Sequence, residues 1–179
     1  MRSAMRWVAC GPSSGWTPMP DLQDLYRAII LDHARDPQNR GLVGDLHEDH
    51  TGQSHQVNPT CGDEITLRVR LTDDEAAIAA LSWEGQGCSI SQASASVMAE
   101  LVEGRSLDEV SRLAGQFRGL MDSRGRDPEP DVVEALGDGA AFAGVSKFPA
   151  RIKCALLGWA ALREAMLLAA PTTGEDSDD

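Results

Sequence analysis

Alternation of apolar and polar residues predicts a small antiparallel sheet. Residues 65–71 alternate strictly, which is the pattern of a strand with one buried face. Residues 72–75 read Thr-Asp-Asp-Glu and predict a turn, so we expect residues 76–84 to form the next strand of a hairpin. Residues 36–60 are polar and rich in His and Gly, and we expect a loop with one edge strand there.

Helical spacing precedes this sheet. Residues 21–35 are predicted to form a helix that begins at Asp21 and ends before Pro37. Its expected buried face is formed by residues that recur at helical spacing: Leu22, Leu25, Tyr26, Ile29, Ile30 and His33.

More helices are predicted after the sheet. They cover four stretches: residues 88–104, 106–120, 131–136 and 149–170. Ser106, with Glu109 three residues later, is the sequence pattern of a capping box. The last helix is expected to turn one stripe of residues inward: Cys154, Leu157, Gly158, Ala161, Leu162, Ala165 and Leu168.

These elements predict an α+β fold, in which an antiparallel sheet of about three strands packs against helices. A chain of 179 residues can bury one such core without disulfides. We assign a single domain to residues 21–170. Residues 1–20 show no apolar period and residues 171–179 carry four acidic side chains, so both segments are predicted to be disordered.

Composition narrows the classes of partner. The formal net charge is -12, from 16 basic and 28 acidic residues, which argues against nucleic acid and anionic membranes as main partners. No stretch is long and apolar enough to span a membrane, and the first residues lack an export signal, so we expect a cytoplasmic protein. In a reducing compartment, cysteines are expected as metal ligands, catalytic thiols or core residues.

Cys61 and Asp63 stand just before the alternating strand. In extended chain, residues two apart lie on one face, so both are in phase with the apolar side of residues 65–71. A carboxylate that faces a core needs a cation or several hydrogen-bond donors. Two interpretations stay open here. Either a metal supplies the cation, or Gly62 breaks the phase and Asp63 begins the strand in solvent.

Cys88 and Cys154 each lie near the start of a predicted helix. At Cys88, backbone N–H groups and the helix dipole favour an anionic side chain. Cys154 lies on the inward stripe of the last helix. Taken singly, each is equally well explained as an inert core residue, and we expect packing to hold both firmly.

Three thiols and one carboxylate together make a complete tetrahedral ligand set. The set consists of Cys61, Asp63, Cys88 and Cys154. Thiolates favour zinc or iron over calcium and magnesium. Because four ionised ligands exceed the charge of a zinc ion, positive neighbours are needed, and we expect Arg151 and Lys153 to supply them.

Four separated motifs give the chain a resemblance to a known family. They are the segment from Leu25-Tyr26 to Pro37-Gln38-Asn39-Arg40-Gly41, Asn58 to Asp63, Gly85 to Ser91, and Phe148 to Cys154. In these motifs the chain resembles the SufU proteins, zinc-dependent sulfur acceptors within the wider IscU/NifU-like iron–sulfur scaffold family. The resemblance runs from Leu22 to Leu168 and implies the fold of that family.

Two features favour the SufU branch within that family. IscU-type scaffolds carry a histidine ligand immediately before the last cysteine, whereas this chain has Lys153, which offers no lone pair while protonated. The chain also holds an extra segment around residues 111–127, between its second and third family cysteines. SufU-type proteins are similar in both respects.

The resemblance implies roles for named residues. Zinc would be bound by the set given above, Cys61 would accept sulfur, and Arg151 would support activity beside the site. The implied partner is a PLP-dependent cysteine desulfurase of the SufS type, whose persulfide sulfur passes to Cys61 and on to a downstream Suf cluster-assembly complex. The chain would then act as a sulfurtransferase. Two alternatives remain: a scaffold that assembles an iron–sulfur cluster on the same residues, and an adaptor with a structural zinc.

Deletion of residues 1–18 is expected to leave folding, zinc content and sulfur acceptance unchanged. These residues show no period, and Met19 directly precedes the first patterned segment. The comparison is between the full chain and a chain that starts at Met19, with soluble yield and zinc per chain as readouts. Loss of either would show that the first residues belong to the folded unit.

Overall fold

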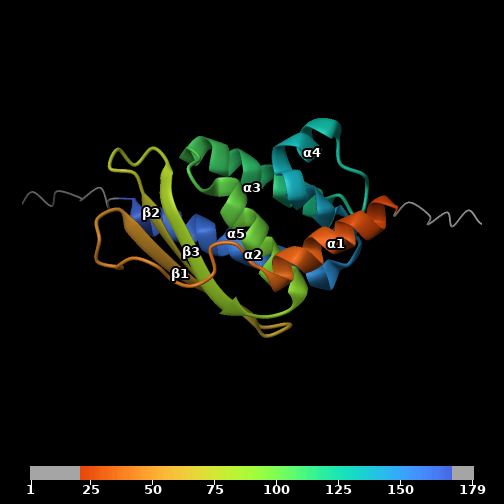
Figure 1. Ribbon diagram of the computed structural model, residues 1–179, viewed down its shortest axis with the longest axis horizontal. Coiled ribbons are helices and arrows are strands. Elements are labelled where there is room, and N and C mark those ends of the chain that lie inside the picture. Colours follow the sequence, from red (N-terminus) through yellow and green to blue (C-terminus); the bar gives the residue numbers. More distant parts are fainter. Residues whose placement is uncertain (1–20, 171–179) are drawn as a thin grey trace, which may run out of the picture.

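A three-stranded antiparallel sheet, in the order β1-β2-β3, forms one layer of the protein (Figure 1). The computed structural model describes residues 21–170. The strands are β1 Thr51–Asn58, β2 Asp63–Leu71 and β3 Ile78–Gln86. The predictions of disorder for residues 1–20 and 171–179 lie outside the described residues.

Helices form the second layer on one face of this sheet (Figure 1). They are α1 Leu22–Arg35, α2 Ser89–Val102, α3 Leu107–Asp122, α4 Pro130–Leu136, the 3-10 helix η1 Gly137–Lys147 and α5 Pro149–Ala169. Helix α5 packs on β1 and β2, while α2 lies between α1 and α5. The predicted α+β architecture is confirmed.

The central strand β2 explains why one sheet face is covered. Its residues alternate between buried and half-buried, and Leu67, Val69 and Leu71 are fully buried beneath the helices. Burying such side chains contributes roughly 1.5–3 kcal/mol each. At the start of the same strand, Asp63 pairs with Asn58, the last residue of β1, so a short turn joins the two strands.

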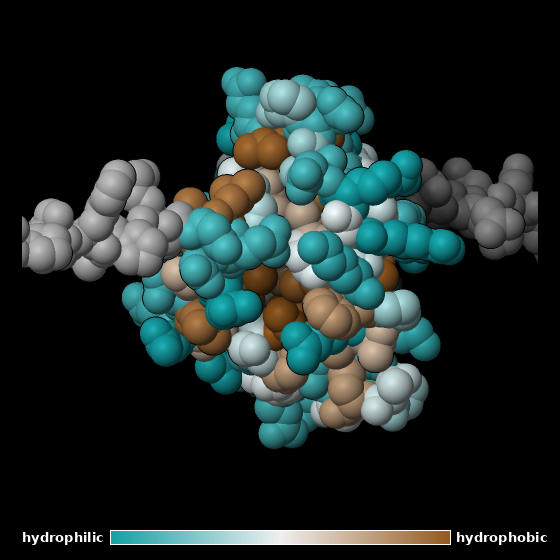
Figure 2. Space-filling view, turned by 90° about the vertical axis from the view of Figure 1, so that its right-hand side faces the viewer, coloured by the Kyte–Doolittle hydropathy of each residue, from teal (hydrophilic) through white to brown (hydrophobic). Residues whose placement is uncertain are grey.

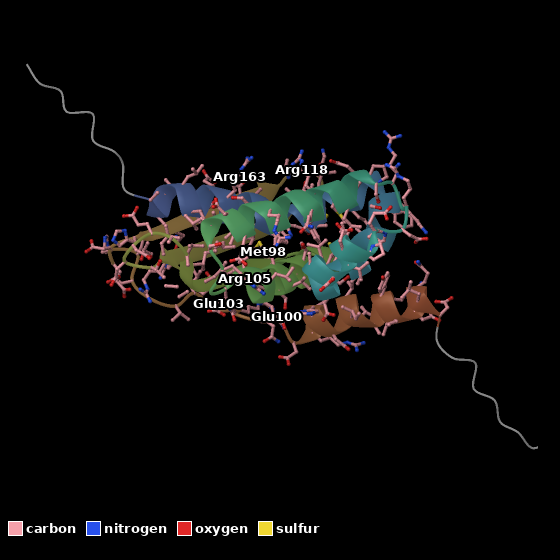
Figure 3. All side chains as sticks on the ribbon, turned by 90° about the horizontal axis from the view of Figure 1, so that it is seen from above. Met98, Glu100, Glu103, Arg105, Arg118 and Arg163 are labelled. Carbon is pink, nitrogen blue, oxygen red and sulfur yellow. The ribbon has the colours of Figure 1, made fainter. Side chains whose placement is uncertain are left out.

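Aromatic side chains join the helices above the sheet. Phe117 of α3 stacks on Trp159 of α5 with ring centroids 4.9 Å apart, and it meets Phe142 of η1 edge-on at 5.5 Å. Viewed from above, Arg118 of α3 and Arg163 of α5 extend from the outer side of this helix pair (Figure 3). No helix within residues 21–170 has the length and apolarity to cross a membrane.

Helix starts were predicted well. Asp21 Oδ1 accepts a hydrogen bond from the Asp24 N–H at 2.8 Å, and α1 begins at the next residue after Asp21. Ser106 and Glu109 form the predicted capping box at the start of α3. Each cap satisfies backbone N–H groups that the first helical turn leaves free.

The predicted buried faces were wrong at two helix ends. Leu22 and Leu25 of α1 are 54% and 50% exposed, and the buried side chain of this helix is Ile30 in its second half. Figure 2, seen from the side of α1, shows apolar side chains open to solvent among polar ones. In α5, Leu168 is 59% exposed and Ala169 is buried in its place, because the inward line continues through Ala165 to Ala169.

Helix η1 was missed, and α3 runs to Asp122 rather than ending at residue 120. The sequence of η1 is rich in small residues and has no clear apolar period, yet Phe142 within it is fully buried. Its end is tied to the loop after α3, because Ser146 Oγ accepts a hydrogen bond from the Gly125 N–H at 2.6 Å. Tertiary packing, rather than local propensity, therefore decides this element.

Gly52→Ala is expected to lower the free energy of unfolding by ~2–3 kcal/mol. A Cβ at this position would overlap the Ala165 carbonyl oxygen and lie 2.5 Å from the Ala169 backbone nitrogen, so backbone would have to move. Gly119→Ala is the matched control, since a Cβ there meets nothing within 4 Å, and it should raise stability by ~0.5–1 kcal/mol. Urea denaturation of both variants tests this; equal effects would contradict the described contact between β1 and α5.

Candidate metal centre

The turn between β1 and β2 carries the first candidate ligand. The Asn58 carbonyl oxygen accepts hydrogen bonds from the N–H groups of Cys61 and Gly62, at 3.3 and 2.8 Å. Gly62 has φ +73°, a left-handed conformation that glycine adopts without steric cost. The turn leaves Cys61 exposed at the surface, immediately before β2.

Asp63 is the first residue of β2, and it is buried, with 3% of its surface exposed. The alternative in which Asp63 begins the strand in solvent is therefore wrong. Its Oδ1 accepts the Cys88 N–H at 3.0 Å, and its Oδ2 lies 3.4 Å from Cys88 Sγ. Burial alone would raise the pKa of the Asp63 carboxyl, but hydrogen bonds from Cys154, Cys61 and Cys88 outweigh it and lower the pKa.

Cys154 lies in the second turn of α5 and is 4% exposed. Its Sγ is 3.1 Å from Cys61 Sγ, and the Asn58 side-chain Nδ2 donates to it at 3.7 Å. Burial, together with hydrogen bonds to Cys61 and Asp63, raises the pKa of the Cys154 thiol strongly. Without a cation, this pocket therefore favours one buried carboxylate and a protonated buried thiol.

Three candidate ligands converge closely enough for one metal ion. The sulfurs of Cys61 and Cys154 and a carboxylate oxygen of Asp63 all lie within 4.8 Å of one another. Two thiols and a carboxylate are donors that suit zinc, and a divalent cation would stabilise the charge that the buried carboxylate brings into this pocket. The donor set thus fits the metal that the sequence suggests.

Cys88 borders this set without belonging to it. Its sulfur reaches Asp63, as described, but it is not part of the group of three mutually close donors. Cys88 is also exposed, so the expectation that packing holds it firmly was wrong. The reason is its place as the N-cap of α2, outside the first helical turn, where neighbouring side chains do not enclose it.

Three residues that shape the site were missed as contributors from sequence. Asn58 shapes the turn of Cys61, as described above. Gly87 permits close approach, because a Cβ there would lie 2.7 Å from the Asp63 carboxylate and 2.6 Å from Ser91 Oγ. Ser91 donates its hydroxyl to the Cys88 carbonyl at 2.9 Å. Their positions within the cysteine motifs are the only sequence signal for these contacts.

The expected positive neighbours are not paired with the buried carboxylate. Arg151 and Lys153 are both exposed, and the Arg151 guanidinium lies 5.3 Å from the centre of the Phe148 ring. Within residues 21–170, neither side chain forms an ion pair with Asp63. A role for Arg151 in activity stays a prediction.

Comparison with known families agrees with this geometry. Residues 25–155 match the family described as the NifU-like N terminal domain. That range covers most of the chain, and it includes all four candidate ligands. The chain therefore belongs to the NifU-like N-terminal domain family.

Individual relatives define the branch more closely. The zinc-dependent sulfurtransferase SufU of Bacillus subtilis strain 168 is 41% identical over 144 residues, which cover 80% of this chain and 90% of that protein. The iron–sulfur cluster assembly scaffold protein IscU of Streptococcus pyogenes serotype M1 is 38% identical over 145 residues, covering 81% and 84%. The resemblance to the SufU and IscU scaffold family is confirmed.

A solved structure supports the same placement. It is that of a candidate iron–sulfur cluster assembly scaffold protein for the SUF system from Fervidobacterium islandicum AW-1. The TM-score is 0.65 at 31% sequence identity, and the match covers 77% of this chain and 93% of that one. The fold and the family assignment thus agree.

The Asp63 carboxylate is expected to make stability depend on acid pH in metal-free protein. Its pKa in the folded state lies below the ordinary value of 3.8, so its contribution is complete above that value and is lost as pH falls through the folded pKa. Asp63→Asn should therefore lose less stability than the native chain from about pH 5 downward.

The matched control for this experiment is Asp73→Asn, which removes the same charge from an exposed turn. Chemical denaturation in the presence of a chelator, at a series of pH values, measures the effect. Parallel pH curves for the native chain and Asp63→Asn would contradict the assigned hydrogen bonds to the carboxylate.

Proposed function

We propose that this protein is a zinc-dependent sulfur carrier, which takes sulfur from a cysteine desulfurase for iron–sulfur cluster assembly. The observation that carries the proposal is the exposed Cys61 thiol, 3.1 Å from the buried Cys154 thiol and next to the buried Asp63 carboxylate. One accessible sulfur therefore belongs to a donor set that suits zinc. The name of the Bacillus relative supports the same activity.

The proposed zinc ligands are the four residues of the predicted set. Cys61, Asp63 and Cys154 already converge, and Cys88 lies beside Asp63 as the fourth donor. Bound zinc would supply positive charge that keeps coordinated sulfur deprotonated. The buried thiol of Cys154 gains most from that charge, since its protein surroundings otherwise favour the protonated form.

Sulfur transfer at Cys61 needs no external oxidant. The Cys61 thiolate attacks the terminal sulfur of a persulfide on the desulfurase, and a new sulfur–sulfur bond forms. The bond between that sulfur and the desulfurase cysteine breaks, and its electron pair leaves with the desulfurase cysteine as a thiolate. The product is a persulfide on Cys61. The PLP that generates the first persulfide belongs to the partner.

We assign Cys61 as the acceptor because its thiol is accessible to a partner. It lies in a turn between Pro59 and Gly62 and is exposed, whereas Cys154 is buried between α5 and the turn.

We further propose that residues 21–170 form the single functional domain, that the protein works in the cytoplasm, and that a SufS-type desulfurase and a downstream Suf complex are its partners. Lys153, in place of the histidine of IscU-type scaffolds, supports the assignment to the SufU branch and therefore these partners.

A cluster scaffold is the second candidate. The name of the Streptococcus relative, which is 38% identical, supports it. The same thiols could then hold iron and sulfide rather than zinc. Labile sulfide bound to protein purified without added metal would favour the scaffold over the carrier.

Cys61→Ser is expected to abolish sulfur acceptance while the fold and part of the zinc binding remain. Cys154→Ser should lose more zinc and more stability, because the buried carboxylate then keeps unbalanced charge. Each variant is incubated with desulfurase and cysteine, and intact mass then reports added sulfur while zinc content and melting temperature are measured. If Cys61→Ser accepts sulfur at the native rate, Cys61 is not the acceptor.

A further inference from the structure

Asn58 contacts both cysteines of the converging set, and it contacts them differently. We propose that Asn58 is a positioning residue that holds Cys154 as the retained metal ligand and leaves the Cys61 sulfur free to exchange. This inference rests on the proposed zinc-dependent sulfur transfer, and it adds the residue that would separate the roles of the two thiols.

The Asn58 side chain is oriented by its own turn. Asn58 is the last residue of β1 and is 5% exposed. Its Oδ1 accepts a hydrogen bond from the Thr60 N–H at 3.1 Å, and only the amide oxygen can accept from a backbone N–H. Nδ2 must therefore occupy the other position, where it donates to Cys154 Sγ at 3.7 Å.

This donor acts on one thiol only. The other groups beside Cys154 Sγ are Cys61 Sγ at 3.1 Å, the Asp63 carboxylate and the Ala150 carbonyl oxygen at 3.9 Å, and neither a carboxylate nor a carbonyl oxygen can donate to a thiolate. Asn58 Nδ2 is thus the N–H donor that the described residues aim at the Cys154 sulfur. Groups that hydrogen-bond a metal ligand orient it and strengthen its binding.

Cys61 is held through its backbone instead. Its N–H donates to the Asn58 carbonyl oxygen, so the turn places the residue, but no N–H group among residues 21–170 donates to its sulfur. Asn58 therefore holds the sulfur of Cys154 but only the main chain of Cys61. The structure assigns retention to Cys154 and exchange to Cys61 through this single residue.

Two substitutions isolate the donated hydrogen bond. Asn58→Asp preserves the shape and the acceptor for Thr60, but it replaces the Nδ2 donor with an oxygen that faces Cys154 Sγ. Asn58→Ser also preserves an acceptor for Thr60, while its hydroxyl is too short to replace Nδ2. Asn39→Asp is the matched control, because its Nδ2 donates to the Leu81 carbonyl at 3.1 Å and to Glu103 at 3.0 Å, away from the cysteines.

The first readout is zinc affinity, measured by competition with a chelator. Both Asn58 variants should bind Zn²⁺ about 10- to 100-fold more weakly than the native chain, with Asn58→Asp the weaker. The control should bind zinc with native affinity even if its melting temperature falls. A purely structural role of Asn58 would lower the melting temperature without this selective loss.

The second readout is the site of alkylation of zinc-loaded protein by limiting iodoacetamide. In the native chain Cys61 should be modified first, and Cys154 only after zinc is removed. In both Asn58 variants Cys154 should be modified alongside Cys61, because its sulfur is no longer retained. Peptide mass spectrometry shows which of the two cysteines, Cys61 or Cys154, carries the label.

Native zinc affinity and native labelling order in both variants would overturn the inference. So would loss of the folded state in both variants under metal-free conditions, since Asn58 would then be a structural residue of the turn. Failure of the proposed function looks different: the native chain itself would bind no zinc, or would accept no sulfur on Cys61.

Discussion

The buried carboxylate of Asp63 is the constraint on which the site depends. A charge at 3% exposure is costly unless donors surround it, and here donors come from α2, from α5 and from Cys61 in the turn before β2. The start of β2 supplies the carboxylate, the N-terminus of α2 supplies the Cys88 N–H at 3.0 Å, and α5 supplies the Cys154 thiol. Satisfying one carboxylate therefore brings these three elements together.

This constraint also explains the small residues around the site. Gly87 must lack a side chain because the carboxylate lies where a Cβ would contact it, at 2.7 Å. Gly62 adopts φ +73°, which lets the chain turn sharply from β1 into β2 and leaves Cys61 at the surface. The outcome is one exposed thiol and one buried thiol in contact, and this asymmetry is what a carrier needs: one sulfur to exchange and one to retain.

Much of this arrangement could be predicted from sequence. Period-2 alternation identified β2, because strand geometry is local. The same phase put both Cys61 and Asp63 on the apolar side; Asp63 is buried, whereas Cys61 lies in the turn before the strand and is exposed. Capping residues likewise identified the starts of α1 and α3. The convergence of Cys61, Asp63 and Cys154 was expected from the ligand types and from the resemblance, and no local period could have shown it.

What sequence could not predict depends on tertiary contacts. Helix η1 has no apolar period, and its burial comes from the helices around it. Cys88 is exposed at the N-cap of α2, and the Arg151 guanidinium lies over the neighbouring Phe148 ring. The hydrogen bonds of Asn58 depend on the turn and on α5 together, so they become visible only in the folded chain.

Metal content distinguishes a zinc-dependent sulfur carrier from a cluster scaffold. Protein purified without added metal is analysed for zinc, iron and labile sulfide, and X-ray absorption identifies the ligand atoms. We expect about one zinc per chain, bound mainly through sulfur, with no labile sulfide. Stoichiometric iron with sulfide, or a zinc site made mostly of nitrogen ligands, would contradict it.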